Sequence, residues 1–175
     1  VIVVSSTRVY GESAGERVDD DTSPQPSDAQ GQVLLNMETL WQQAYPSECV
    51  IVRPTGIYGT SVSRMIKLAE TTKSYPKLHW SNRIHIDDLV AFLAHLLHVE
   101  HTEKSYICSN SQPLPLHEIM QWFQQQLGLP VLVLESAVSS GKQIHATRMQ
   151  QMNFELQHSH CFDDYLALLA ERESK

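Results

Sequence analysis

The 175-residue sequence predicts an α/β fold, in which the back half of a doubly wound parallel sheet precedes a smaller, helix-rich part. Two observations carry this prediction. Residues 1–4 and 48–53 contain unbroken apolar runs, mostly of β-branched side chains, which is typical of strands buried on both faces. An amphipathic helix lies between them, and a strand–helix–strand unit implies two parallel strands joined by a right-handed crossover.

The helix between these strands is predicted by its two ends and by its apolar stripe. Ser27 and Gln30 match a capping box, and Tyr45-Pro46 ends the helix after Ala44. Apolar side chains recur at the helical spacing, which predicts a single packing face. That face consists of Val33, Leu34, Met37, Leu40, Trp41 and Ala44.

Five further helices and two short strands follow. We predict helices over residues 61–71, 87–98, 115–127, 146–152 and 162–171, and strands over 105–109 and 131–134. Asp87 or Asp88 is expected to cap the second of these helices. A parallel sheet needs several strands with helices on both faces, so the few strands of the first half predict part of a larger α/β domain. The other strands would come from a longer chain, a partner or a swapped subunit.

No metal site is predicted. The polar segment 12–27 reads as a surface excursion, and its run Asp19-Asp20-Asp21 lacks the alternating ligands and distal glutamate of a calcium loop. We therefore expect these carboxylates to be solvated. His95, His98 and His101 drift around one helix instead of following the i, i+4 spacing of zinc ligands, which also favours a solvated face.

Charge and cysteine content exclude further classes. The net charge of −7 argues against binding to nucleic acid or to anionic membranes. No apolar run is long enough for a transmembrane helix, which takes about 18 residues or more. The cysteines Cys49, Cys108 and Cys161 form no C-x-x-C pair, so free thiols in a cytoplasmic setting are expected instead of disulfides or zinc.

Three motifs in a fixed order carry a family resemblance. Residues 5–11 (SSTRVYG) and 53–59 (RPTGIYG) stand at the carboxyl ends of predicted strands, where open α/β sheets bind their ligands. Residues 82–89 (NRIHIDDL) form the third motif. The set resembles the extended short-chain dehydrogenase/reductase superfamily, the NAD(P)-dependent nucleotide-sugar epimerases and dehydratases, and the resemblance spans nearly the whole chain.

The resemblance implies a Rossmann-type fold and a cofactor. Residues 1–80 would be the C-terminal part of the dinucleotide-binding domain, and residues 81–175 a mixed region of substrate-domain and C-terminal helices. NAD or NADP would be the cofactor, and a nucleotide sugar or a similar hydroxyl or carbonyl compound the substrate. The family's G-x-x-G-x-x-G phosphate turn is absent, so most of the cofactor site would precede this chain. We expect this chain alone to be inactive and to bind dinucleotide weakly.

The resemblance also implies roles for seven residues by their motif positions. Ser6 would supply the catalytic hydroxyl. The alternative is a purely structural role, in which this hydroxyl at the end of a strand forms a hydrogen bond with the backbone. His85 and Asp87 are expected to be structural. The cofactor would contact Ser5, Pro54 and Thr55, and the substrate would contact Thr7, Gly56 and Arg83.

One departure from the family concerns the chemistry. Members carry Y-x-x-x-K on the helix after the serine strand, and alignment on Glu38 places Gln30 and Leu34 at these two positions. Neither side chain can donate or accept a proton in catalysis. Two functions therefore stay open: an atypical epimerase/dehydratase-like oxidoreductase, and a catalytically silent protein that senses NAD(P) or acts as a scaffold. The apolar helix face would then suit a homodimer.

Overall fold

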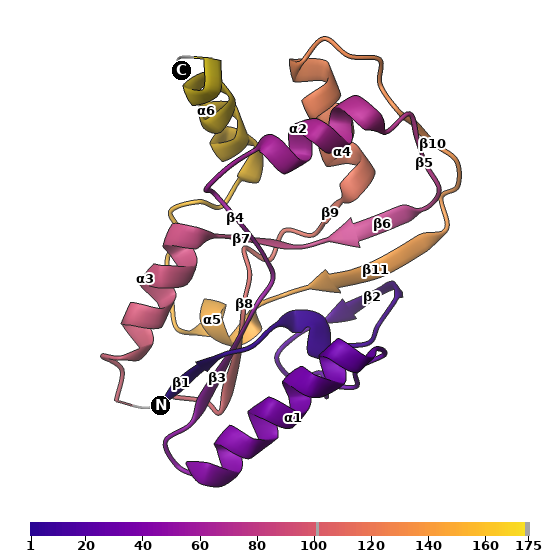
Figure 1. The fold of residues 1–175 in the computed structure, drawn as a ribbon. Coiled ribbons are helices and arrows are strands. Elements are labelled where there is room, and N and C mark those ends of the chain that lie inside the picture. Colours follow the sequence, from indigo (N-terminus) through magenta and orange to yellow (C-terminus); the bar gives the residue numbers. More distant parts are fainter. Residues whose placement is uncertain (101, 174–175) are drawn as a thin grey trace.

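The computed structural model describes residues 1–100 and 102–173, and a three-stranded parallel sheet lies near one end (Figure 1). Its strand order is β1 (Ile2–Val4), β3 (Val50–Pro54), β8 (Ser105–Cys108). Every residue of β3 is buried, as its apolar run predicts. This parallel arrangement confirms the α/β class. Strand β8 comes from the second half of the chain, and the division at residue 80 stays a prediction.

Strand β1 differs from its prediction in burial. Val3 is buried opposite Ile51, but Val4 is 48% exposed. Among the described residues, β1 pairs only with β3 and so forms an edge of this sheet. The apolar run identified the strand correctly, but the described residues bury only part of it.

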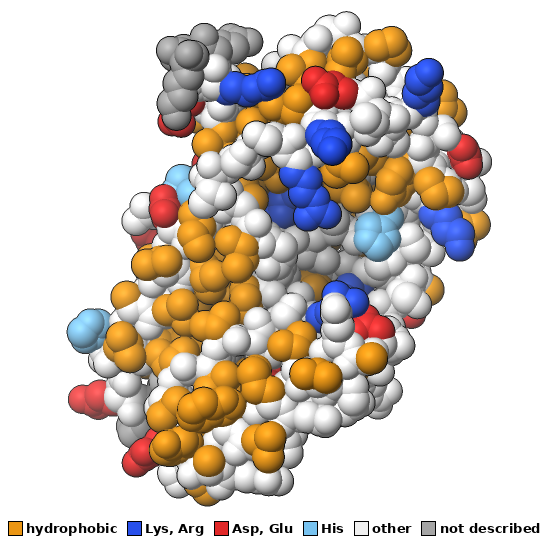
Figure 2. Space-filling view, viewed as in Figure 1, with side chains coloured by type: hydrophobic (Ala, Val, Ile, Leu, Met, Phe, Trp, Pro, Cys, Tyr) orange, Lys and Arg blue, Asp and Glu red, His pale blue; other side chains and the backbone are white. Residues whose placement is uncertain are grey.

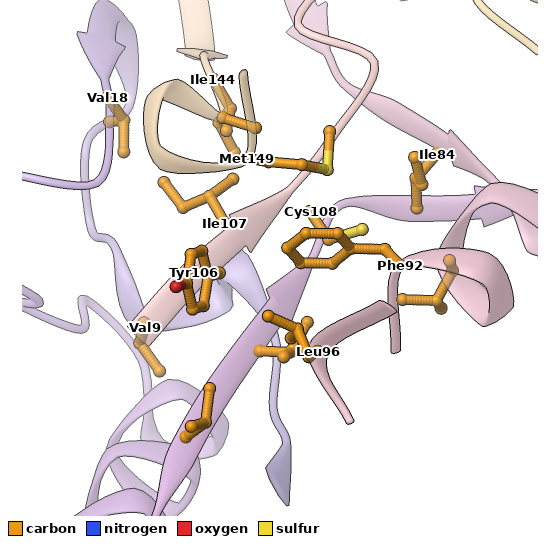
Figure 3. Packing of buried hydrophobic residues seen from close by; sticks show 14 of the residues in the cluster. Val9, Val18, Ile84, Phe92, Leu96, Tyr106, Ile107, Cys108, Ile144 and Met149 are labelled. Atoms are coloured by element: carbon orange, nitrogen blue, oxygen red, sulfur yellow. The ribbon is translucent and has the colours of Figure 1, made fainter. Parts of the chain in front are cut away.

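Helices cover both faces of the sheet. Ile51 packs with Met37 of α1 (Ala29–Ala44), whereas Val52 belongs to a larger cluster with Phe92 of α3 (Ile86–Leu96). Residues of β8 and of the short helix α5 (Thr147–Gln151) complete the larger cluster (Figure 3). Alternate side chains of one central strand therefore serve two layers of helices, as in a doubly wound fold.

A second, helix-rich part lies at the other end of the molecule (Figure 1). It consists of α2 (Ser63–Thr71), α4 (Leu116–Gln126) and α6 (Cys161–Glu173). These helices share a separate hydrophobic cluster around Ile66, Phe123 and Tyr165. Together with α1, α3 and α5 they confirm all six predicted helices. No helix among the described residues has the length and apolar character needed to cross a membrane.

Short strands connect the two parts, and most of them were not predicted. A four-stranded sheet has the order β2 (Ala14–Val18), β11 (Ser139–Ile144), β6 (Leu78–Ser81), β9 (Leu114–Pro115). Two further pairs are β4 (Gly56–Tyr58) with β7 (Arg83–His85), and β5 (Ser74–Tyr75) with β10 (Val133–Leu134). The predicted surface excursion 12–27 therefore contains a strand, and β10 lies within the predicted strand 131–134.

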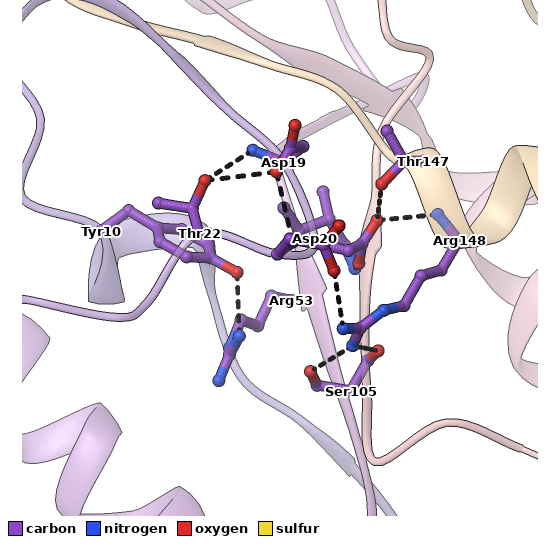
Figure 4. Close-up of polar contacts among 10 residues, drawn as sticks. Tyr10, Asp19, Asp20, Thr22, Arg53, Ser105, Thr147 and Arg148 are labelled. Carbon is purple, nitrogen blue, oxygen red and sulfur yellow. Dashed lines mark hydrogen bonds and ion pairs between the residues drawn. The ribbon is translucent and has the colours of Figure 1, made fainter.

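The expectation that Asp20 is solvated is wrong. Its carboxylate is buried and accepts hydrogen bonds from the backbone N–H groups of Ile107 (2.6 Å) and Arg148 (2.9 Å), and from the Thr147 hydroxyl (3.1 Å). Figure 4 shows the hydrogen bonds of this carboxylate with Thr147 and Arg148 of α5. Asp20 thus ties the loop after β2 to both β8 and α5, and a buried carboxylate needs such partners.

The predicted packing face of α1 is wrong in part, because Leu34 and Met37 pack against hydrophobic clusters but other members are exposed. Val33 and Leu40 are 67% and 65% exposed, and Figure 2 shows apolar side chains gathered over this region. The helix instead buries Gly31 and Glu38. Glu38 accepts two hydrogen bonds from the Arg53 guanidinium, at 2.7 and 3.1 Å, so a buried ion pair replaces part of the expected apolar contact.

Two predicted caps are replaced by neighbouring residues. The N-cap of α1 is Asp28, not Ser27, and its carboxylate accepts from the Gly31 N–H at 2.8 Å. The N-cap of α3 is His85, whose Nδ1 accepts from the Asp87 N–H at 3.2 Å. Asp88 is buried and accepts from two backbone N–H groups of the loop before α6 instead.

Candidate functional site

A pocket of about 430 Å³ opens where the first two strands of the parallel sheet end. Thr7 follows β1, and Thr55 and Gly56 follow β3, so all three approach the pocket from the carboxyl ends of neighbouring parallel strands. The opposite wall comes from β6 and β11. Figure 2 shows this part of the surface as a hollow with basic side chains around it. Open α/β sheets bind ligands at this edge.

The two threonines that line the pocket donate their hydroxyl protons within the protein. The Thr7 hydroxyl donates to the Pro54 carbonyl at 3.3 Å, and the Thr55 hydroxyl donates to the Cys108 carbonyl at 3.4 Å. Both protons are thereby used, while each oxygen keeps lone pairs for a ligand. The structure brings together these two predicted residues and Gly56, which lines the pocket beside them.

Ser5 and Ser6 lie next to the pocket but do not line it. The Ser6 hydroxyl accepts from the Arg8 N–H at 3.2 Å and caps the short helix η1 (Thr7–Val9). That is the local backbone bond considered above as the alternative to catalysis. The Ser5 hydroxyl is buried and has no hydrogen-bond partner among the described residues.

A second pocket of about 280 Å³ holds Arg83. It shares the lining residues Gly56 and Asn82 with the first pocket, so the two pockets are neighbours. The Arg83 Nε donates to the Tyr165 hydroxyl at 3.0 Å, but its Nη1 is buried without a partner in the described chain. Arg64 lines the same pocket, and none of the described lining residues is acidic.

The comparisons agree with this geometry. A scan against protein-family models and a search of the curated proteins find no match. A solved structure from Methylobacillus flagellatus, assigned to the NAD-dependent epimerase/dehydratases, superposes with a TM-score of 0.87 at 35% identity over 99% of this chain. The chain is similar to an NAD-dependent epimerase/dehydratase in both sequence and fold. It spans 64% of the length of that structure.

Two more distant superfamily structures share the fold. The dTDP-glucose 4,6-dehydratase of Bacillus anthracis, solved with NAD, gives a TM-score of 0.78 at 16% identity and covers 99% of this chain and 62% of its own. The UDP-N-acetylglucosamine 4-epimerase of Bacillus cereus gives 0.74 at 11% identity, with 95% and 65% covered. This chain therefore spans under two thirds of the length of each of the three superfamily structures.

Gln30 and Leu34 do not line the first pocket. Both are on α1, where they line a shallow apolar surface with Arg8 and Val33. Gln30 is exposed and Leu34 is half-buried against the larger cluster. Neither residue lines the first pocket together with Thr7 and Thr55.

Several residues of the first pocket were missed by the sequence analysis. His79, Trp80 and Lys142 come from β6 and β11, two strands without an apolar signature. Burial lowers the pKa of the Lys142 ammonium below its usual value, and burial likewise lowers the pKa of His79. The one signal that could have found this wall is Gly141, a glycine directly before a lysine in a polar segment.

A histidine pair near α3 gathers potential metal ligands but does not aim them at one point. Nitrogens of His85 and His158 and a carboxylate oxygen of Asp87 all lie within 4.8 Å of one another. The two rings are stacked, with centroids 3.6 Å apart and an angle of 15° between them. Imidazole lone pairs lie in the ring plane, so those of stacked rings point side by side instead of converging. His158 Nδ1 instead pairs with Asp164 at 2.6 Å.

Of the three histidines tested above against the zinc spacing, the structure describes His95 and His98. His95 packs against the Phe154 ring, with 5.6 Å between ring centroids. His98 follows α3, and His101 lies outside the described residues.

Proposed function

We propose that this chain is the substrate-facing part of an NAD(P)-dependent epimerase/dehydratase-like protein that acts on a nucleotide sugar. The observation that carries the proposal is Arg83, a buried guanidinium with an unpaired Nη1 in a pocket that also holds Arg64. Leaving a charged donor buried without a partner is costly. A diphosphate would satisfy Arg83 and neutralise both guanidinium groups, because phosphate oxygens accept bidentate bonds from arginine.

The shared lining of the two neighbouring pockets supports an extended ligand. A diphosphate at Arg64 and Arg83 would direct the attached sugar past Gly56 towards Thr7 and Thr55. We assign substrate contacts to Thr7, Gly56 and Arg83. Structures with this fold include one solved with UDP-glucuronic acid and NAD and another with UDP-glucose and NAD.

The cofactor roles follow the motif positions. Ser5, Pro54 and Thr55 would line the nicotinamide, which supplies hydride exchange when bound, and Ser6 would hydrogen-bond the reacting oxygen. A buried Ser5 hydroxyl without a partner fits a site that completes its bonds with a ligand. The residues that would hold the cofactor phosphates are not in this chain, which has no glycine-rich turn.

A second candidate function is a catalytically silent NAD(P) sensor or scaffold. Gln30 and Leu34 favour it, because they stand where the family has its tyrosine and lysine and because neither lines the pocket. A homodimer through α1, a swapped assembly and a cytoplasmic location remain predictions for either function.

Titration calorimetry on the full-length protein tests both functions. We expect binding of NAD(H) or NADP(H), and binding of a nucleoside diphosphate that weakens at least tenfold in Arg83→Met and in Arg64→Met. Arg64 is exposed, so its variant tests the site without disturbing the fold. Turnover of a nucleotide sugar would support the enzyme, and binding without turnover the sensor. Absence of dinucleotide binding would overturn both.

A further inference from the structure

Lys142 is held in the first pocket by a local distortion of β11. Gly141, directly before Lys142, has a φ of +72°, which favours glycine. A Cβ at Gly141 would lie 2.5 Å from the Trp80 carbonyl oxygen, so a side chain there would clash with β6. The pairing with β2 shifts register at the same place, because Gly15 of β2 is an extra residue between the partners of Gly141 and Lys142.

The backbone on both sides of Lys142 is fixed by one amide. The Asn82 Nδ2 donates to the Lys142 carbonyl, and the Asn82 Oδ1 accepts from the Ile144 N–H, both at 2.8 Å. Asn82 itself lines both pockets. The position of the Lys142 backbone is therefore tied to the junction between the pockets.

Lys142 and Glu12 bring unused hydrogen-bonding capacity into the pocket. The ammonium has three donors and bonds one described partner, the Tyr10 carbonyl. Glu12 is a lining residue whose Oε2 is buried and unpaired among the described residues. Burial lowers the pKa of Lys142, and the negative charge of Glu12 acts in the opposite direction.

The charges of this pair select against a phosphate. Lys142 alone would attract an anion, but Glu12 in the same pocket would repel it. The second pocket has two arginines and no acidic lining residue in the described chain, so an anion is bound better there. A donor beside an acceptor instead suits hydroxyl groups, which can accept from the ammonium and donate to the carboxylate.

We propose that Lys142 and Glu12 bind hydroxyl groups of the sugar moiety of the substrate, and so determine that the first pocket takes an uncharged, polyhydroxylated ring. This rests on the proposed function, in which Arg64 and Arg83 bind the diphosphate of the same ligand. Both residues act by contact with the substrate. They supply a donor and an acceptor in a pocket that Gln30 and Leu34 do not reach.

Calorimetry with matched ligands tests the pair in the full-length protein. The ligands are UDP-glucose, dTDP-glucose, ADP-glucose and GDP-mannose, each compared with its nucleoside diphosphate. We expect the wild type to bind one nucleotide sugar about tenfold or more tightly than the matching diphosphate. Lys142→Met and Glu12→Gln should bring this ratio close to one and leave the diphosphate affinity unchanged, which also reports that each variant is folded.

Lys104→Met is the matched control, because Lys104 is exposed and lines none of the pockets described above. It should keep the wild-type ratio. If both pocket variants also keep that ratio, the pair has no role in binding the sugar and the proposed function stands. The same conclusion follows if the sugar adds nothing to the wild-type affinity while Arg83→Met still loses the diphosphate. If no ligand of the panel binds the wild type, the nucleotide-sugar function fails, and the inference fails with it.

Discussion

Cys108 shows how burial changes the chemistry of a single residue. Its thiol lies in the larger hydrophobic cluster at the end of β8, where it is fully buried. Burial raises its pKa to about 12, and the carboxylates of Asp88 and Asp20 act in the same direction. The thiol is therefore a small apolar core group and a poor nucleophile, as expected for a structural cysteine.

This shift makes a prediction about alkaline stability. In the unfolded chain the Cys108 thiol ionises near pH 9, whereas the folded state holds it neutral to about pH 12. Between pH 9 and pH 12 the folded state therefore keeps the thiol proton that the unfolded chain loses. The stabilisation of the folded state by the neutral, buried thiol is fully present below pH 9 and is lost as the pH rises from 9 towards 12. Urea unfolding at pH 8 and pH 10.5 should show a smaller loss of stability for Cys108→Ala than for the wild type.

The comparison must be between slopes and not between absolute stabilities. Cys108→Ala also leaves a small cavity, which lowers stability at both pH values alike. Equal losses between pH 8 and pH 10.5 in the two proteins would contradict the prediction.

Of the seven residues to which the resemblance gives roles, Thr7, Thr55, Gly56 and Arg83 line the two pockets. Thr7, Thr55 and Gly56 follow parallel strands, and the ends of such strands meet at one edge whatever the side chains are. Ser6 stands at a similar position, but its hydroxyl accepts from a backbone N–H two residues along the chain. Such local competition depends on dihedral angles that the sequence does not display.

At the scale of elements, the spacing of apolar residues predicted the helices and strands that bury an apolar face. All six helices and the strands β1, β3 and β8 follow apolar patterns, and their predicted bounds are close to those observed. Strands β2, β6 and β11 have no such pattern, because they contain many polar residues and form through pairing with segments far away in the chain. The wall of the pocket that carries Lys142 was therefore invisible in the sequence.

Helix α1 shows a further limit of periodicity. Val33 and Leu40 of its apolar stripe are exposed, while Gly31, which has no side chain, is buried. A Cβ at Gly31 would lie 2.7 Å from the Arg8 carbonyl oxygen and 2.9 Å from Pro26, both rigid groups. The absence of a side chain thus lets α1 approach η1.

We predict that Gly31→Ala destabilises the protein although alanine is the better helix former. Helix propensity would stabilise by about 1 kcal/mol, whereas forcing a methyl group into a close backbone contact typically costs about 1–3 kcal/mol. Gln43→Ala on an exposed position of the same helix is the control, and it should be neutral or slightly stabilising. Urea unfolding measures both. A Gly31→Ala variant as stable as the wild type would show that α1 can move away from η1 at no cost.

At the scale of the whole molecule, the pockets lie where two hydrophobic clusters meet. The larger cluster holds the parallel sheet with α3 and α5, and the smaller one holds α2, α4 and α6. Gly56 follows the sheet directly, and Arg83 bonds Tyr165 of the smaller cluster. A ligand in both pockets would therefore contact residues anchored in both cores.

Separate cores predict separate local stabilities. Phe92 and Phe123 are both fully buried, the first in the larger cluster and the second in the smaller one. Truncating a buried phenylalanine typically costs about 3–5 kcal/mol, and cooperative units of a protein open at different free energies. Phe123→Ala should therefore raise amide hydrogen exchange in α2, α4 and α6 while β3 and β8 stay protected.

Phe92→Ala is the matched variant, because it removes the same side chain from the other core. Phe92→Ala should raise amide hydrogen exchange in the parallel sheet. Exchange in the helix-rich part should rise as well if the stability of that part depends on the sheet. Hydrogen exchange followed by mass spectrometry distinguishes these patterns peptide by peptide. If Phe123→Ala instead raises exchange uniformly in both parts, the two clusters unfold as one unit. The junction that holds Asn82 and Gly56 would then be as rigid as either core, and the pockets would be preformed and not assembled by the ligand.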